Sequence, residues 1–170
     1  MTTVLGEGRI FQLNVSAGGV PKRSAARAHV SPGGVEGDQQ RDLESHGGPE
    51  RAVCLFSLEH ILALQAEGHP IYPGSVGENL TLAGIDMSQL VYGDRLTIGE
   101  GDGMVELQIT TFTNPCANIK DSFADGIFTR ISQKVNPGMS RLYARVLRSG
   151  DLRPAMPVRA TRDATPLQTE

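Results

Sequence analysis

The sequence is poor in cysteine and in aromatic residues: its 170 residues include two cysteines, no tryptophan and 5% aromatics. Two thiolates are too few for an iron–sulfur cluster held by four cysteines. No Gly-x-Gly-x-x-Gly or Walker motif marks a nucleotide cofactor, and pyridoxal phosphate is not expected either. We therefore expect a reducing, cytoplasmic setting in which Cys54 and Cys116 are free thiols.

Charged runs and long apolar runs are also missing. The formal net charge is −3, and no basic run with interleaved aromatics is present, so nucleic acid is not an expected partner. No window approaches the length of a membrane span, and residues 1–8 lack the basic start and apolar centre of a signal peptide. We therefore expect no membrane association.

Glycine and proline, by contrast, are frequent, at 20 and 10 residues. This composition is typical of many short strands joined by turns, and not of a helical bundle. Several segments carry apolar residues in alternation or in short buried runs, which are the patterns of strands. These predicted strands cover residues 4–15, 25–30, 52–56, 79–83, 90–92, 96–98, 105–111, 142–147 and 157–160.

The helical content is predicted to be small. One helix is expected between Ser57, which can cap its start, and Gly68, which can end it. His60 lies in this helix, where a lone histidine is more often a packing or surface residue than a ligand. Two weaker helices are predicted over residues 117–126 and 127–134.

Together these elements predict a mostly β fold, with a barrel of about eight short strands and a few helical insertions. The barrel would form a single domain over residues 1–160. Residues 161–170 have little apolar surface to bury and are predicted to be a flexible tail.

Cys116 follows the predicted strand 105–111 almost directly, with Pro115 before it. Proline has no N–H group to continue a strand ladder and holds Asn114 extended. The thiol is therefore expected at a strand end, where loops carry most chemistry. The residues alone leave open a nucleophile, a soft metal ligand and an inert buried thiol. Cys54 lies within the apolar run 52–56 and is predicted to be a packing residue.

Four polar, glycine-rich clusters lie in predicted loops, and each alone would be read as an ordinary turn. Two of them fall in the predicted loop 31–49, and loops of this length in a compact domain are usually functional or disordered. The clusters are Gly18-Gly19-Val20-Pro21-Lys22, Glu36-Gly37-Asp38, His46-Gly47-Gly48-Pro49 with Arg51, and residues 74–80, which end in Gly77-Glu78-Asn79-Leu80.

This ordered set, followed by Pro115-Cys116, resembles the MOSC family, named after the C-terminal domain of molybdenum cofactor sulfurases. It is most similar to the small stand-alone bacterial members related to the hydroxylaminopurine-resistance protein. The resemblance covers residues 18–116 and continues more weakly over 142–151. It implies a β-barrel-like fold and a molybdenum-pterin cofactor whose metal is bound by Cys116. Molybdenum takes thiolate ligands readily, and a coordinated thiol is deprotonated.

The resemblance also implies residues that hold the anionic cofactor. Lys22 and Arg51 would supply cationic groups to its phosphate, and Gly47 and Gly48 would supply backbone N–H donors. Asn79 would use its amide, which both donates and accepts hydrogen bonds, on the pterin edge.

His46 is the second catalytic residue that the resemblance implies beside Cys116, because an imidazole can move protons near neutral pH. The sequence departs from the family at Gln39, where many members carry arginine and where this chain has its next arginine at Arg41. That difference removes one expected phosphate anchor.

These inferences favour a molybdenum-dependent reductase of N-hydroxylated or N-oxygenated small molecules. Because the sequence shows no flavin or iron–sulfur motif, the electrons would come from a separate electron-donor protein. One alternative is a binding module that carries the cofactor, or sulfur on Cys116, to another enzyme. A second is a cofactor-free thiol hydrolase that uses Cys116 with His46 or His60, although no known nucleophile motif surrounds the thiol. A wholly structural role is a further alternative.

Overall fold

The computed structural model describes residues 1–39 and 48–164. The strands of the main sheet are β1 (Thr2–Val15), β2 (Arg23–Ala25), β5 (Val53–Ser57), β6 (Leu80–Ala83), β7 (Arg95–Ile98), β8 (Val105–Phe112), β9 (Leu142–Arg148) and β11 (Pro157–Asp163). A smaller sheet contains β3 (Ala28–Ser31), β4 (Gly34–Val35) and β10 (Gly150–Leu152).

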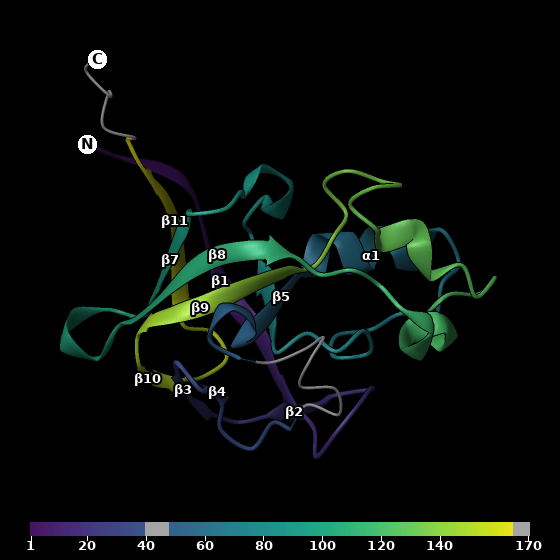
Figure 1. Ribbon diagram of the computed structural model, residues 1–170, viewed down its shortest axis with the longest axis horizontal. Coiled ribbons are helices and arrows are strands. Elements are labelled where there is room, and N and C mark those ends of the chain that lie inside the picture. Colours follow the sequence, from purple (N-terminus) through teal and green to yellow (C-terminus); the bar gives the residue numbers. More distant parts are fainter. Residues whose placement is uncertain (40–47, 165–170) are drawn as a thin grey trace.

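The main sheet closes into a barrel. Its strand order is β11-β7-β8-β9-β5-β6-β1-β2, and β11 also pairs with β1 (Figure 1). That additional pairing joins seven strands into a ring and leaves β2 as an extra strand beside β1. The predicted mostly β barrel with few helices is therefore confirmed.

Strand β1 closes the barrel because it is long enough to change partners along its length. Its first half pairs with β11, from Thr2 opposite Asp163 to Arg9 opposite Pro157, and its second half pairs with β6 and β2. At Gly8 the Ala83 carbonyl of the neighbouring strand β6 lies so close that a side chain would collide with it. Glycine is therefore required where β1 crosses from one partner to the next.

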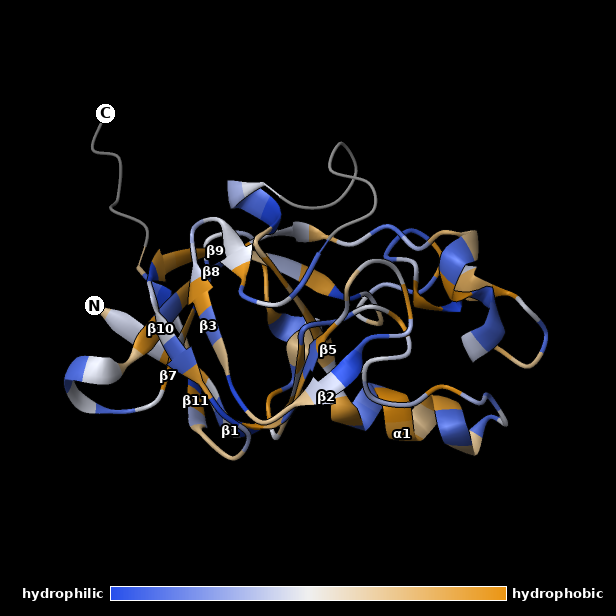
Figure 2. Ribbon diagram, turned by 90° about the horizontal axis from the view of Figure 1, so that it is seen from below, coloured by the Kyte–Doolittle hydropathy of each residue, from blue (hydrophilic) through white to orange (hydrophobic). Residues whose placement is uncertain are grey.

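Aliphatic side chains fill the barrel, and a second apolar cluster lies outside it under helix α1 (Leu58–Ala66). Figure 2 shows hydrophobic stretches along the barrel strands and alternating hydrophobic and hydrophilic residues along α1. The second cluster joins Ile61 and Leu64 of α1 to Phe56, Ile119 and Phe123. It thereby attaches the segment that follows Cys116 to the body of the domain.

The predicted helix is confirmed with its caps. The Ser57 hydroxyl accepts a hydrogen bond from the His60 N–H at 3.1 Å, and Gly68 ends the helix with a φ of 98°. The remaining described helices are short 3₁₀ turns: η1 (Pro49–Arg51), η2 (Met87–Gln89), η3 (Gly101–Gly103), η4 (Ala117–Ser122) and η5 (Phe128–Ile131). Within residues 1–39 and 48–164, none of the helices is long and apolar enough to cross a membrane.

Three sequence predictions differ from the structure in detail. The predicted strand 25–30 is divided between β2 and β3, and the helices predicted over 117–126 and 127–134 are reduced to η4 and η5. Residues 90–92 form a turn because the Asp94 carboxylate accepts the Val91 N–H at 2.9 Å, a donor that a strand ladder would use.

The predicted domain boundary at residue 160 falls inside β11, which continues to Asp163. The last residues of β11 pair with the start of β1, so both ends of the described chain lie at the same end of the barrel (Figure 1). The predicted tail beyond residue 164 lies outside the described residues.

Candidate cofactor site near Cys116

Cys116 lies four residues after the end of strand β8 and directly precedes η4 as its N-cap residue. Its thiol is partly exposed, and its carbonyl accepts the Ile119 N–H at 3.2 Å to start the 3₁₀ turn. Three residues earlier, the Thr113 N–H donates to the Arg141 carbonyl at 2.9 Å, which continues the pairing of β8 with β9. The backbone up to Thr113 is thus fixed by the barrel, and Cys116 lies within about 11 Å of it along the chain.

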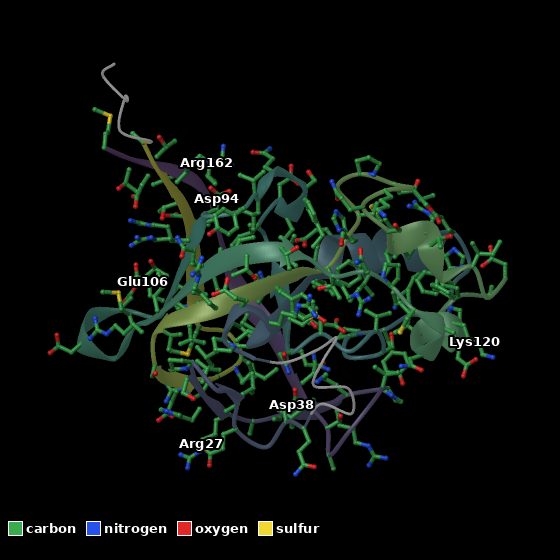
Figure 3. All side chains as sticks on the ribbon, viewed as in Figure 1. Arg27, Asp38, Asp94, Glu106, Lys120 and Arg162 are labelled. Atoms are coloured by element: carbon green, nitrogen blue, oxygen red, sulfur yellow. The ribbon has the colours of Figure 1, made fainter. Side chains whose placement is uncertain are left out.

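Lys22 is buried in an ion pair with Asp38. The Lys22 Nζ and an Asp38 oxygen are 2.6 Å apart, and the two side chains are 5% and 3% exposed. The same Asp38 oxygen accepts the Asn79 Nδ2–H at 2.9 Å, and the other oxygen accepts the Ser16 N–H at 2.8 Å. Asp38 therefore holds the Lys22 and Asn79 side chains together; Figure 3 labels it close to the place where Figure 1 labels β2.

Asn79 joins β1 to β5 through both its side chain and its backbone. Its Oδ1 accepts the Cys54 N–H at 3.0 Å, and its N–H donates to the Cys54 carbonyl at 2.8 Å. The Asn14 N–H donates to the Asn79 carbonyl at 2.7 Å, and the Asn79 side chain returns a bond to the Asn14 carbonyl at 3.3 Å. Its amide oxygen and nitrogen are therefore already bonded within the protein.

Cys54 is fully enclosed between these strands. Its sulfur lies 3.7 Å from the Thr113 hydroxyl, and burial raises the pKa of the thiol. The cations of Arg141 and Lys22 oppose this rise, whereas Glu78 adds to it. Both cysteines are unpaired, as predicted, and only Cys116 is open to solvent.

Arg141 is a buried cation that sequence reasoning did not find. Its side chain is only 5% exposed, and its Nη1 donates to the Val76 carbonyl at 2.5 Å. Its Nε–H is buried without a hydrogen-bond partner among the described residues. A buried, unpaired N–H of a cation leaves a strong donor unsatisfied.

Glu78 faces the same interior. It is completely buried, and its Oε2 accepts the Thr81 hydroxyl at 3.0 Å, whereas its Oε1 has no partner among the described residues. Burial raises the pKa of the carboxyl to about 7, and hydrogen bonds from the backbone and Thr81, together with the charge of Arg141, hold it from rising further. Near neutral pH this carboxyl therefore neutralises Arg141 only in part.

Arg51 enters the cluster from η1. Its guanidinium lies 5.7 Å from the centre of the Tyr143 ring, a cation–π contact. Burial raises the pKa of Tyr143, so its hydroxyl stays protonated. The η1 turn itself is held by the Thr110 hydroxyl, which donates to the Glu50 carbonyl at 2.5 Å, so Arg51 is fixed against β8 and β9.

The structure therefore gathers several of the predicted residues. Lys22 and Asn79 share Asp38, and Asn79 is bonded to Cys54, whose sulfur contacts Thr113 just before Cys116. Gly48 opens η1 with a φ of 81°, three residues before Arg51. His46, Gly47 and Arg41 lie outside the described residues.

Two further histidines, His60 and His69, pack against aromatic rings. His60 packs edge-on against Phe56 with ring centres 5.8 Å apart, and burial lowers its pKa. His69 accepts the Ala124 N–H at 3.1 Å and packs edge-on against Phe123. Both therefore act in packing, as the position of His60 in its helix predicted.

Sequence reasoning missed the partners of the predicted residues. Asp38 belonged to a recognised cluster, but its contact with Lys22 spans 16 positions and could not be read from the pattern. Glu78 also belonged to a recognised cluster but was assigned no role, and Arg141 carries no local signal, because a charge at the start of a strand is usually solvated. Only the unpaired buried atoms in the folded structure mark them.

The three cationic side chains and the Cys116 thiol fit an anionic cofactor whose metal binds sulfur. Lys22, Arg141 and Arg51 bring three cations to this end of the barrel, whereas Asp38 supplies one paired carboxylate and Glu78 is partly protonated near neutral pH. In the described part of the chain, no three His, Cys, Asp or Glu side chains are placed to share a metal ion. Cys116 lies three residues along the chain from Thr113, whose N–H is bonded to the Arg141 carbonyl, and its soft thiol matches a metal that arrives with an anionic cofactor.

The structure is thus a small, mostly β domain with a closed barrel and a partly exposed cysteine just after a barrel strand. The sequence matches the family model described as "MOSC domain" over residues 42–159. This chain belongs to the MOSC domain family, as the sequence resemblance indicated.

Similar proteins include two from bacteria and one from a fungus. The chain is 31% identical over 138 residues to the uncharacterized protein YflK of Bacillus subtilis, covering 80% of this chain and 60% of YflK. It is 32% identical over 94 residues to protein YiiM of Escherichia coli, covering 53% and 40%. It is 28% identical over 124 residues to a protein named "Reductase" from Gibberella moniliformis, covering 70% and 21%. The chain thus spans 60% or less of these relatives.

Solved structures share the fold. The YUAD protein from Bacillus subtilis has a TM-score of 0.70 at 16% identity, covering 96% of this chain and all of that one. YiiM from Geobacillus stearothermophilus has a TM-score of 0.69 at 24% identity, covering 90% and 74%. At these identities the likeness shows the architecture alone.

Proposed function

We propose that this domain binds the molybdenum-pterin cofactor and reduces N-hydroxylated or N-oxygenated small molecules. Membership in the MOSC family is consistent with a molybdenum-cofactor-associated domain. The observation that carries the proposal is the partly exposed Cys116 three residues from Thr113, which is bonded to Arg141, a buried cation with an unsatisfied N–H. The protein named "Reductase" among the relatives supports a redox role.

In this proposal Cys116 is the protein ligand of the metal. Arg51 and the Gly47 and Gly48 N–H groups hold the anionic part of the cofactor, together with the unpaired Arg141 Nε–H. Lys22 acts through Asp38, because its ammonium is already paired, and contributes positive potential. Asn79 keeps the β1–β5 junction in place, because its amide oxygen and nitrogen are bonded to Cys54, Asn14 and Asp38. His46 supplies or accepts protons next to the substrate.

The reaction balances as R–NHOH + 2 electrons + 2 protons → R–NH₂ + H₂O. When bound, the cofactor supplies the two-electron chemistry that breaks the N–O bond. The chain contributes orientation of the metal through Cys116 and the two protons, for which His46 is the proposed route. A separate electron-donor protein supplies the electrons, and a cytoplasmic setting suits both free thiols.

The test is metal analysis followed by an activity assay. Protein made in a host that synthesises the cofactor should contain about one molybdenum per chain. That loaded protein should reduce a hydroxylamine-type substrate with a chemical electron donor. Absence of molybdenum from a folded preparation would contradict the proposal.

The same experiment separates the carrier alternative. A module that only carries the cofactor, or sulfur on Cys116, should bind molybdenum but show no turnover with any N-hydroxylated substrate. It should also pass its cargo to an acceptor apoenzyme. Turnover by the isolated domain would exclude a purely carrying role.

A further inference from the structure

A small crevice lies next to the segment that begins at Cys116. It has a volume of about 190 Å³ and lies between the turn at Val20-Pro21, the segment 70–75, and η4. One side is apolar, formed by Pro21, Pro70 and the ring of Tyr72, which is 49% exposed. This size suits a single ring system, since sites for whole drug-sized molecules are larger.

The walls of the crevice are held at a fixed separation. The Ser122 hydroxyl of η4 donates to the Ser75 carbonyl at 3.3 Å, which ties the two walls together. The Tyr72 N–H donates to the Ser75 hydroxyl at 3.0 Å, so the tyrosine backbone is locked to the same residue. Ile119 beneath is only 3% exposed. The crevice is therefore preformed, and binding would require little reorganisation.

The polar side of the crevice comes from one face of η4. Asn118 and Asp121 are three residues apart, and in a 3₁₀ helix side chains at that spacing are eclipsed. Both are exposed and both line the crevice. Within residues 1–39 and 48–164, neither side chain takes part in a hydrogen bond or ion pair. An amide and a carboxylate thus stand side by side, opposite the tyrosine wall.

This arrangement fits one kind of ligand. A flat ring packs on an aromatic side chain, and a carboxylate accepts N–H hydrogen bonds but donates none. Asn118 offers both a donor and an acceptor next to it. The chemistry selects a planar nitrogen heterocycle whose edge carries amino or ring N–H groups.

The crevice is also close to Cys116. Asn118 is only two residues from it, so their Cα atoms lie within about 7 Å of each other whatever the local conformation. Figure 3 labels Lys120 of the same turn at the outer end of the molecule.

We propose that this crevice binds the flat ring of a heteroaromatic substrate, with Tyr72 packing on the ring and Asp121 and Asn118 bonding its edge. The inference rests on the proposed reductase function for its substrate, and it adds the residues that select aromatic over aliphatic N-hydroxylated compounds. Ring binding itself needs no metal, so it can be tested separately.

The first test titrates adenine, a planar ring with an amino donor, into the metal-free protein and follows the amide signals by NMR. Tyr72→Ala should weaken adenine binding about 10-fold, because loss of one stacked aromatic side chain has effects of that size. Tyr72→Phe should retain affinity, and Asp121→Asn should lower it about 5-fold. Tyr92→Ala is the matched control, because Tyr92 is 70% exposed and lies against Arg145 instead.

The second test uses the loaded protein. Tyr72→Ala should raise KM for an N-hydroxylated purine about 10-fold with kcat nearly unchanged, and should leave KM for an aliphatic hydroxylamine unaltered. No adenine binding by the wild type, or equal losses in Tyr72→Ala and Tyr92→Ala, would overturn the crevice assignment. If adenine binds there but no N-hydroxylated compound is reduced, the proposed function fails while the ring site stands. If both substrate types are reduced and both respond equally to Tyr72→Ala, the function stands and the ring site fails.

Discussion

The interior of this protein has two regions of different kind. Inside the barrel the core is aliphatic, with side chains such as Leu96, Ile98 and Leu107 completely buried. At the end nearest Cys116 the interior instead contains buried charges, of which Lys22, Glu78 and Arg141 are at most 5% exposed. Apolar residues of similar volume would stabilise a fold equally well or better. We therefore propose that the second region serves ligand binding, whereas the first serves stability.

Breaking the Lys22–Asp38 pair should have the largest effect. Lys22→Ala leaves the Asp38 carboxylate buried without its cation, so we expect a loss of about 3–5 kcal/mol in the free energy of unfolding. Urea denaturation measures it. The control is Glu7→Gln, which breaks an exposed ion pair: the Glu7 side chain is 62% exposed and its partner Arg159 is 59% exposed. That change should cost about 0–1 kcal/mol. Equal effects would show that burial of the first pair is irrelevant.

Gly74 tests how tightly the loop 74–79 packs on Lys22. It has a φ of 90°, and an added Cβ would collide with the Lys22 carbonyl and approach the Asn14 side chain. Gly74→Ala should therefore destabilise by about 3 kcal/mol, from backbone strain and collision together. Gly37 has a similar φ of 84°, but an added Cβ there would meet open space. Gly37→Ala should therefore cost only the backbone strain of about 1 kcal/mol. Thermal unfolding of the two variants gives the difference.

Glu78, in the region of buried charges, makes the free energy of unfolding depend on pH. The carboxyl ionises at its ordinary pKa of 4.5 in the unfolded chain but at about 7 in the fold. Its stabilising effect is thus fully present below pH 4.5 and is lost as the pH rises through about 7. We expect a loss of about 3 kcal/mol across that window, which Glu78→Gln should remove. Denaturation curves at several pH values, wild type against variant, test this; parallel curves would contradict it.

Controls aside, Cys54→Ala should have the smallest effect on stability among these variants. Cys54→Ala removes one buried sulfur and should cost about 1–2 kcal/mol, as other small core truncations do. Cofactor content should not change, because Cys54 is fully enclosed. Metal analysis of the folded variant checks this, and loss of molybdenum from it would identify Cys54 as the ligand.

The sequence predicted the apolar region well because its signals are local. Alternation marked strands such as β8, and Ser57 and Gly68 marked both ends of α1. The polar region could be predicted only in part, through the recognised glycine-rich clusters. Its contacts join residues far apart in the chain, such as Arg141 and Val76 or Asn79 and Asp38. No periodicity encodes such pairs, so Arg141, and the burial of Glu78 within its recognised cluster, became visible only in the fold.

The most direct measurement compares molybdenum content and turnover per bound metal in Cys116→Ser and Cys54→Ala, both made in a host that synthesises the cofactor. Serine offers a hydroxyl that stays protonated at neutral pH in place of a soft thiolate. The account predicts that Cys116→Ser folds normally but has almost no turnover per metal, whereas Cys54→Ala matches the wild type. Undiminished turnover per bound metal in Cys116→Ser would contradict the assignment of Cys116 as the essential ligand.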